Sequence, residues 1–270
     1  MAPIPNKVQL RLISALKKFQ TVLKNAKTKD INESDTVIIV TDMVAEIFGY
    51  DKYSEITSEK AINKTYCDLA INIDNKLTFL IEIKAVGLDL KADYVRQAVN
   101  YGSNEDVDWV ILTNGITWKI FKIIFGKPIS NELIYEFDMF SLNPKNPSDI
   151  ELLYLVSKES LGKSALEDYV LQKQTLSKFF IGQILITEPI LDGIRKTIRK
   201  VFPAFKVTND EIKEVLENDV IKREVFDDEK SDDARKRINK VFKTVIKKEP
   251  LLIVKPQEVK NQIITPDKTI

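Results

Sequence analysis

The alternation of apolar and polar residues between positions 66 and 83 constrains the fold of this chain more than any other feature. Apolar side chains occupy every second position over residues 69–73 and again over residues 77–83. A period of two residues is typical of a β-strand with one apolar face. A short polar segment, residues 74–76, separates the two runs. The sequence therefore predicts a β-hairpin.

The hydrophobic pattern also selects a register for this hairpin. A three-residue loop pairs Leu69 with Ile81 and gathers the apolar side chains on one face. Asp68 and Glu82 then lie opposite each other on the other face, which Lys84 shares. A two-residue loop would shift the pairing by one position and place Asp68 on the apolar face. We therefore expect a three-residue loop and a pair of carboxylates with a nearby lysine, held on rigid strands.

The composition limits the chemistry that these residues can perform. The 270 residues include no histidine and one cysteine, Cys67. Histidine general bases, Ser-His and Cys-His pairs and structural zinc sites are therefore excluded. Carboxylates, lysine, hydroxyl groups and hard oxygen-bound ions such as Mg²⁺ remain. The net charge of +1 argues against a polybasic nucleic-acid binder but is compatible with a local basic groove.

Three further features predict a cytoplasmic location. A single cysteine cannot form an internal disulfide, which fits a reducing compartment. No apolar run approaches the roughly 20 residues of a membrane span. The N-terminal sequence lacks the apolar core of a signal peptide. We expect no membrane partner.

Helical and strand patterns surround the hairpin. The sequence predicts helices over residues 7–27, 32–49 and 92–101, and strands at 55–57, 107–113, 116–121 and 133–137, the last at a sheet edge. The segment Asn-Pro-Lys-Asn-Pro at 143–147 is a candidate domain boundary. After it, helices are predicted over residues 148–156, 164–186, 190–201, 209–222 and 234–248. We therefore expect three regions: a first domain over residues 1–145, a helical domain over 146–249 and an extended or disordered tail over 250–270.

The order of charged residues in the first region resembles that of the PD-(D/E)xK nuclease superfamily. Asp68 on one strand is followed by Glu82-Ile83-Lys84 on the next, and Gln97-x-x-x-Tyr101 lies on the following helix. Within this superfamily the sequence is similar to the RecB-like nucleases, to the N-terminal nuclease domain of type I restriction enzyme R subunits and to predicted stand-alone restriction endonucleases. The matching segments are Asn32-Glu33, Gly49-Tyr50-Asp51, Asp68, 81–85, 97–101 and 112–123.

The resemblance implies a restriction-endonuclease-like α/β core, a mixed central sheet flanked by helices, with a mostly helical C-terminal extension. Two differences stand out. Cys67 replaces the proline that normally precedes the first aspartate, and the sequence lacks the large translocase that follows the nuclease domain in the R subunits. We therefore expect a free-standing nuclease domain.

The resemblance also implies metal ligands. Asp68, Glu82 and the Ile83 carbonyl would bind Mg²⁺, with Mn²⁺ as a substitute. Lys84 would orient the attacking water or stabilise developing charge on the phosphate.

The remaining family positions have more ordinary alternatives. Gln97 would hold water or a phosphate oxygen with support from Tyr101, although such a pair is more often a simple helix-face contact. Glu33 matches the first acidic position, and Glu46 competes for that role. Glu33 is also typical of a helix start, where the dipole favours an acid. An exposed strand face would explain Glu82 and Lys84 if they were considered alone.

Two basic clusters in the second half are candidates for contacts with the DNA backbone. The first comprises Arg195, Lys196, Arg199, Lys200 and Lys206, and the second Arg235, Lys236, Arg237 and Lys240. Phosphate contacts of this kind position a duplex without reading its sequence. A solvated helix face is the common alternative.

These patterns predict a Mg²⁺-dependent DNA endonuclease that acts in restriction on double-stranded DNA. Because cutting both strands commonly requires two sites, a homodimer is a candidate assembly. Restriction-modification subunits are further candidate partners. The alternative is a silent module that keeps the nuclease fold and binds DNA or a partner subunit. A third reading is an RNA-directed or repair nuclease with the same site.

Overall fold

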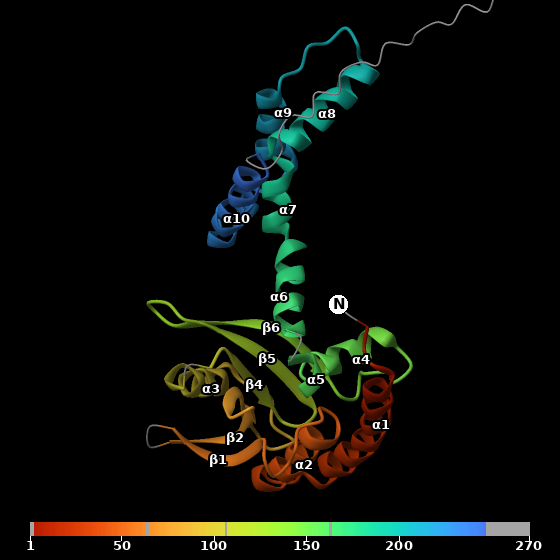
Figure 1. Ribbon diagram of the computed structural model, residues 1–270, viewed down its shortest axis with the longest axis vertical. Helices are drawn as coiled ribbons and strands as arrows, with labels where there is room; N and C mark the ends of the chain where they lie inside the picture. The colour runs from red at the N-terminus through yellow and green to blue at the C-terminus, as the bar shows by residue number, and fades with distance from the viewer. Residues whose placement is uncertain (1–2, 63–64, 106, 162–163, 247–270) are drawn as a thin grey trace, which may run out of the picture. The chain divides into compact units, whose positions relative to one another are not determined.

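A computed structural model of the protein describes residues 3–62, 65–105, 107–161 and 164–246. The chain forms two compact units, Met1–Gln172 and Lys173–Ile270, which we describe separately. Figure 1 shows the sheet with its helices in the first unit and the helices of the second. The predicted tail over residues 250–270 lies outside the described residues.

A six-stranded mixed sheet forms the centre of the first unit. The strands are β1 (Ile56–Ile62), β2 (Thr65–Ile73), β3 (Lys76–Ile83), β4 (Trp109–Thr113), β5 (Thr117–Ile124) and β6 (Ser130–Asp138), and they lie side by side in that order. The neighbours β3 and β4 are parallel, and the other neighbouring pairs are antiparallel. The parallel pair needs a crossover connection, which helix α3 (Ala92–Asn104) provides.

Helices cover both faces of this sheet. On one face, α1 (Asn6–Lys29) and α2 (Glu33–Glu46) pack against Leu69, Ile71, Phe79 and Ile81. On the other face, Ala98 and Val99 of α3 pack against β4 and β5. The predicted α/β fold with a mixed sheet flanked by helices is confirmed (Figure 1).

The β2–β3 turn differs from the prediction. The turn contains two residues, Asp74 and Asn75, because Ile73 pairs with Lys76. Both turn residues have positive φ angles, 49° and 62°, as a two-residue hairpin turn requires. A bulge then restores the predicted pairing of Leu69 with Ile81. Leu69, Ile71, Phe79 and Ile81 therefore share the apolar face as predicted, but the three-residue loop was wrong, and Leu77 pairs with Asn72 and packs on the opposite face beside Leu80.

Three helices after β6 complete the first unit. They are α4 (Pro147–Tyr154), α5 (Lys158–Leu161) and α6 (Ala165–Thr175), the last of which reaches the boundary between the units. Ile150, Leu153 and Leu166 are buried in the same core as α1 and the sheet. The compact unit thus continues beyond residue 145, and a domain boundary at that position stays a prediction.

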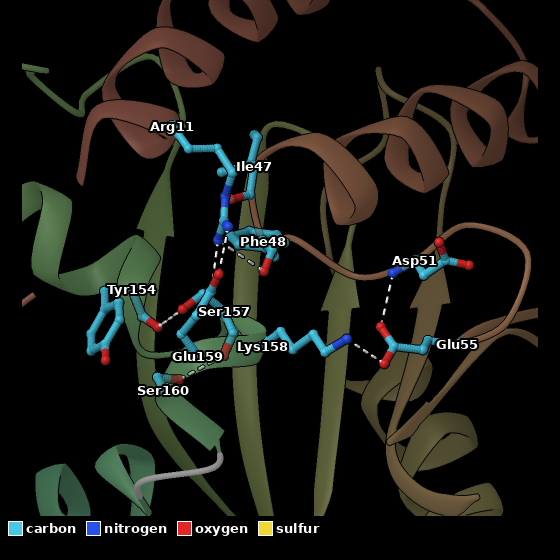
Figure 2. A network of polar contacts seen from close by, with 10 residues as sticks. All are labelled: Arg11, Ile47, Phe48, Asp51, Glu55, Tyr154, Ser157, Lys158, Glu159 and Ser160. Atoms are coloured by element: carbon cyan, nitrogen blue, oxygen red, sulfur yellow. Dashed lines mark hydrogen bonds and ion pairs between the residues drawn. The ribbon is translucent and has the colours of Figure 1, made fainter. Parts of the chain in front are cut away.

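A polar network also holds α5 against the N-terminal elements of the first unit (Figure 2). The guanidinium of Arg11 donates two hydrogen bonds to Glu159, of 2.6 and 2.7 Å, and a third to the Ile47 carbonyl. Lys158 forms a salt bridge of 2.6 Å with Glu55. Bidentate arginine–carboxylate pairs are among the stronger polar contacts in proteins. The network therefore fixes the start of α5 against α1 and the end of α2.

The second unit is helical, as predicted. Its elements are α7 (Lys178–Leu185), α8 (Glu188–Val201), α9 (Asn209–Val215), a π-helical turn (Leu216–Val220), a 3₁₀ turn (Arg223–Val225) and α10 (Glu229–Ile246). A single helix was predicted over residues 164–186, but the structure has two helices there, because α6 ends at Thr175 and α7 begins at Lys178. The side chain of Ser177 accepts a hydrogen bond from the Phe180 N–H and so starts α7 as its N-cap.

The helices α7 and α10 pack closely in this unit. Gln183 donates a buried hydrogen bond of 2.8 Å to the Ser231 hydroxyl. Helix α7 also packs against the 3₁₀ turn, where a Cβ atom at Gly182 would lie 2.6 Å from a methyl carbon of Val225. Across the described parts of both units, every helix is too short or too polar to cross a membrane.

Candidate active site

Asp68 lies on β2 with its carboxylate directed at β3. The backbone N–H of Ile83 donates a hydrogen bond of 2.6 Å to Oδ2 of Asp68. This contact depends on the pairing of Leu69 with Ile81, which sets the two strands in register. Burial raises the pKa of Asp68, although the Ile83 N–H and Lys84 oppose that effect. The Asp68 carboxylate therefore has one oxygen fixed by the neighbouring strand.

Glu82 and Lys84 form a buried ion pair at the end of β3. The Lys84 ammonium lies 2.7 Å from Oε1 of Glu82, and the two side chains are 11% and 2% exposed. The second oxygen of Glu82, Oε2, is buried and has no hydrogen-bond partner. A buried polar atom without a partner is uncommon in proteins and calls for an explanation such as an ion. This atom is the strongest sign of a site in the described parts of the chain.

The electrostatics of the ion pair follow from its burial. Desolvation raises the pKa of Glu82 to about 7, and the nearby Asp68 adds to this effect while Lys84 opposes it. Burial alone would lower the pKa of Lys84, but the hydrogen bond to Glu82 and the surrounding carboxylates raise it overall. Lys84 is thus cationic at neutral pH, whereas Glu82 is close to its titration midpoint.

Glu33 is the acidic residue that the structure brings to this group. Its Oε2 lies 3.7 Å from the Lys84 ammonium. Glu33 is the first residue of α2, and Asn32 caps that helix by accepting a hydrogen bond from the Asp35 N–H. The competing candidate, Glu46, pairs with Lys18 at 2.7 Å. Of the two, Glu33 is therefore the one beside Lys84.

Gln97 and Tyr101 contact each other on α3. The Gln97 amide donates a hydrogen bond of 2.9 Å to the Tyr101 hydroxyl. Gln97 is exposed, while Tyr101 is buried against Cys67 and Leu80. Among the hydrogen bonds and ion pairs of the described residues, neither joins the carboxylates or Lys84. The structure thus places this pair on the helix that covers the site strands without direct contact to the charged group.

Two neighbours complete the surroundings. The Lys84 ammonium lies 5.4 Å from the ring centroid of Tyr94, a cation–π contact. Tyr94 lies on α3, three residues before Gln97, and was not among the predicted site residues. Cys67 is fully buried, and burial together with Glu82 and Asp68 raises the pKa of its thiol to about 12. Cys67 is therefore a packing residue, because a thiol of this pKa supplies almost no thiolate.

The donor set fits a hard ion that keeps several waters. Asp68 and Glu82 supply two carboxylates, and Glu82 has an oxygen without a partner. In the described parts of the chain, no three His, Cys, Asp or Glu side chains gather closely enough to bind an ion by themselves. Mg²⁺ commonly binds to one or two carboxylates and retains water ligands. The predicted role of the Ile83 carbonyl stays a prediction.

Comparison with known proteins supports the predicted resemblance. Residues 28–133 match the family described as "Type I restriction enzyme R protein N terminus", a span that contains β1–β5 and every candidate residue of the site. The predicted resemblance to the N-terminal domain of type I restriction enzyme R subunits is therefore confirmed, and the mixed sheet flanked by helices fits a restriction-endonuclease-like fold.

Other comparisons add little. No curated protein matches the chain. Among solved structures, that of the type IIG restriction endonuclease BpuSI matches with 15% sequence identity and a TM-score of 0.33. The match covers 74% of this chain and 28% of that enzyme.

Proposed function

We propose that this protein is a Mg²⁺-dependent DNA endonuclease that hydrolyses phosphodiester bonds in restriction. The observation that carries the proposal is the buried, unpartnered Oε2 of Glu82 beside Asp68 and Lys84. A structural ion pair gains nothing from an unsatisfied carboxylate oxygen, whereas a metal ligand requires one. The match of residues 28–133 to the restriction enzyme family supports the same conclusion.

The carboxylates of Asp68 and Glu82 would hold the ion, with help from the Ile83 carbonyl. When bound, Mg²⁺ or Mn²⁺ supplies Lewis-acid activation of a water molecule and neutralises charge on the phosphate. The Ile83 N–H keeps the Asp68 carboxylate in place through the 2.6 Å hydrogen bond. This contact fixes a ligand on two paired strands, so little reorganisation is needed when the ion arrives.

Lys84 would stabilise the negative charge that develops on the phosphate. Its ammonium has three donors, and Glu82 and Glu33 hold it from two sides at 2.7 and 3.7 Å. An ammonium fixed in a largely buried position is more effective than one in water, because the surroundings need not reorganise during the reaction. Gln97, exposed on α3 and anchored by Tyr101, would bind a phosphate oxygen of the incoming strand.

The pKa of Glu82 makes metal binding depend on pH. A metal ion requires the ionised carboxylate, and the pKa of Glu82 is about 7 in the folded protein. Ion binding therefore strengthens as the pH rises through about 7, and activity should rise with it.

Cleavage of supercoiled plasmid tests the proposal. We expect nicked or linear product with Mg²⁺ or Mn²⁺, and none with Lys84→Ala or Glu82→Ala. Lys119→Ala is a matched control, because Lys119 is also a strand lysine beside a glutamate, Glu136, at 3.8 Å. Equal cleavage by all variants would assign the product to a contaminant or to another site.

The silent module is the alternative that a negative result would favour. If the wild type cleaves neither methylated nor unmethylated plasmid, the chain is a binding module or requires restriction-modification subunits. Cleavage of RNA in preference to DNA would favour an RNA-directed nuclease. Sedimentation with and without DNA tests the proposed homodimer.

A further inference from the structure

The segment between α8 and α9 exposes two aromatic rings in the second unit. Phe202 and Phe205 are 56% and 66% exposed. Residues 193–208 also contain five lysine or arginine residues and no aspartate or glutamate. Figure 1 shows this segment as the end of α8 and the loop that returns to α9. Large exposed aromatic side chains that lie close together on a surface commonly mark an interaction site.

The sequence fixes the geometry of these rings. Pro203 disfavours helical backbone at the residue before it, and Phe202 accordingly has a φ of −130° and a ψ of 79°. Helix α8 therefore ends at Val201. A hydrogen bond of 3.2 Å from the Phe205 N–H to the Phe202 carbonyl then closes a tight turn. The two ring centroids lie 6.2 Å apart with the rings nearly perpendicular. A turn of this kind presents both rings in a defined position.

The two predicted basic clusters differ in the structure. On α10, Arg235 and Lys236 form salt bridges with aspartates one turn earlier on the same helix. On α8, Arg195 pairs with Asp192 in the same way, whereas Arg199, Lys200 and Lys206 near the turn are exposed and take part in no salt bridge within the described residues. The α8–α9 turn therefore keeps its positive charge available for a partner, whereas much of the charge on α10 is internally compensated.

Most of the apolar face of α8 is covered. Leu191 is buried, Ile194 and Ile198 are half-buried, and Ile190 is 38% exposed. A helix that binds a membrane surface needs a broad exposed apolar face along its length. On α8 and the turn that follows it, the apolar side chains that are more than half exposed are Val201, Phe202 and Phe205. Isolated rings with cations around them match a ligand that offers flat π-faces and anionic groups.

We propose that this aromatic–basic turn binds single-stranded nucleic acid. Phe202 and Phe205 stack on unpaired bases, while Arg199, Lys200 and Lys206 contact the phosphates. Stacking on aromatic side chains combined with backbone phosphate contacts is the common mode of single-strand binding. Duplex DNA offers the phosphates but keeps its bases stacked on one another. All the residues of this proposal belong to the second unit, so the proposal does not depend on the cleavage site proposed for the first unit.

Fluorescence anisotropy with labelled oligonucleotides tests this proposal. The probes are oligothymidylate and oligouridylate of about 15 nucleotides, near the upper limit of known single-strand site sizes, and a duplex of equal length. EDTA in the buffer prevents metal-dependent cleavage, so a failure of the proposed nuclease activity cannot affect the result. The two single strands distinguish DNA from RNA as the source of the ligand.

Substitutions at the turn should separate stacking from charge. Phe202→Ala with Phe205→Ala should weaken single-strand binding at least tenfold, the effect expected for loss of stacking on a base or two, and should change duplex binding little. Arg199→Ala with Lys200→Ala should weaken binding to every probe and reduce the slope of log affinity against log salt by about 1.4 for single strands. Arg235→Ala with Lys236→Ala removes the same charge from α10 and is the matched control.

Other outcomes would overturn the proposal. Single-strand affinity that the double phenylalanine variant leaves unchanged would exclude stacking. An equal loss of oligonucleotide affinity in the Arg235→Ala, Lys236→Ala control would show that binding depends on net charge and not on the turn. Binding to anionic phospholipid vesicles without oligonucleotide binding would assign the turn to a membrane surface. Concentration-dependent self-association that the phenylalanine substitutions abolish, again without oligonucleotide binding, would assign it to a second copy of the chain.

Discussion

Glu82→Gln should change the pH dependence of stability in the first unit. The Glu82 side chain is 2% exposed, and desolvation raises its pKa from 4.5 to about 7. Between these values the folded protein holds a proton that the unfolded chain has released. Stability falls with rising pH wherever the folded state binds more protons, so the wild type should lose stability across this window. Glutamine has the same size but does not titrate.

The magnitude follows from the pKa difference. The shift is 7 − 4.5, about 2.5 units, which at 1.36 kcal/mol per unit corresponds to about 3 kcal/mol once the pH is above 7. The variant also replaces the carboxylate partner of Lys84 with a neutral amide oxygen, which can still accept its hydrogen bond and adds an offset that does not depend on pH. That offset leaves the slope unchanged between pH 5 and 8, because Lys84 stays protonated there. The stability difference, variant minus wild type, should therefore rise by about 2 to 3 kcal/mol over this range.

Urea unfolding followed by tryptophan fluorescence measures this difference. Both tryptophans of the chain, Trp109 and Trp118, lie on β4 and β5, so the signal reports the first unit. Metal must be absent, since an ion at Glu82 would favour the charged form. Glu151→Gln on α4 is the control, because Glu151 is exposed. A difference that stays constant within about 0.5 kcal/mol from pH 5 to 8, the usual scatter of surface substitutions, would refute the reasoning.

Three further predictions concern ion binding and packing. Addition of Mg²⁺ should raise the melting temperature of the wild type more at pH 8 than at pH 6, and should leave Glu82→Ala unchanged, as differential scanning fluorimetry can test. Arg11→Ala should reduce the stability of the first unit by about 2 kcal/mol, because it removes the bidentate pair of Figure 2; an unchanged urea midpoint would contradict this. Gly182→Ala should destabilise the second unit by about 1 to 3 kcal/mol, because the added methyl group overpacks the α7 contact. Gly193→Ala is the control, since a Cβ atom at Gly193 would have no other atom within 4 Å. This substitution should instead stabilise α8 by up to about 1 kcal/mol. Unfolding followed by far-UV circular dichroism measures the stability of both variants.

Hydrophobic periodicity predicted the hairpin but not its turn. The pairing of Leu69 with Ile81 followed from the requirement that apolar residues share a face, and the structure has it. A two-residue turn with a bulge reaches the same pairing as a three-residue loop, so the pattern cannot separate them. The positive φ angles at Asp74 and Asn75 identify the turn that forms.

The charged group was predicted more completely than its environment. Strand alternation predicted that Asp68, Glu82 and Lys84 share a face, and in the structure Lys84 contacts Glu82 while the Asp68 carboxylate accepts a hydrogen bond from the Ile83 N–H between them. Burial of Glu82 and the unpartnered oxygen were not predictable, because they depend on elements that pack over the strand face from elsewhere in the chain. The choice between Glu33 and Glu46 also required tertiary structure, since both lie on α2 and only its packing decides which one approaches Lys84.

A titration with Mn²⁺, followed by the loss of the free-ion signal in electron paramagnetic resonance, tests the central claim most directly. A cleavage assay would also depend on the choice of DNA sequence, on methylation and on partner subunits, whereas the proposed ion binding would depend only on Asp68, Glu82 and their neighbours. The wild type should bind about one ion per chain at this site, more tightly at pH 8 than at pH 6. Glu82→Ala should lose that ion, and Glu151→Ala should keep it. Equal Mn²⁺ binding by Glu82→Ala and the wild type, or no binding by either, would contradict the account.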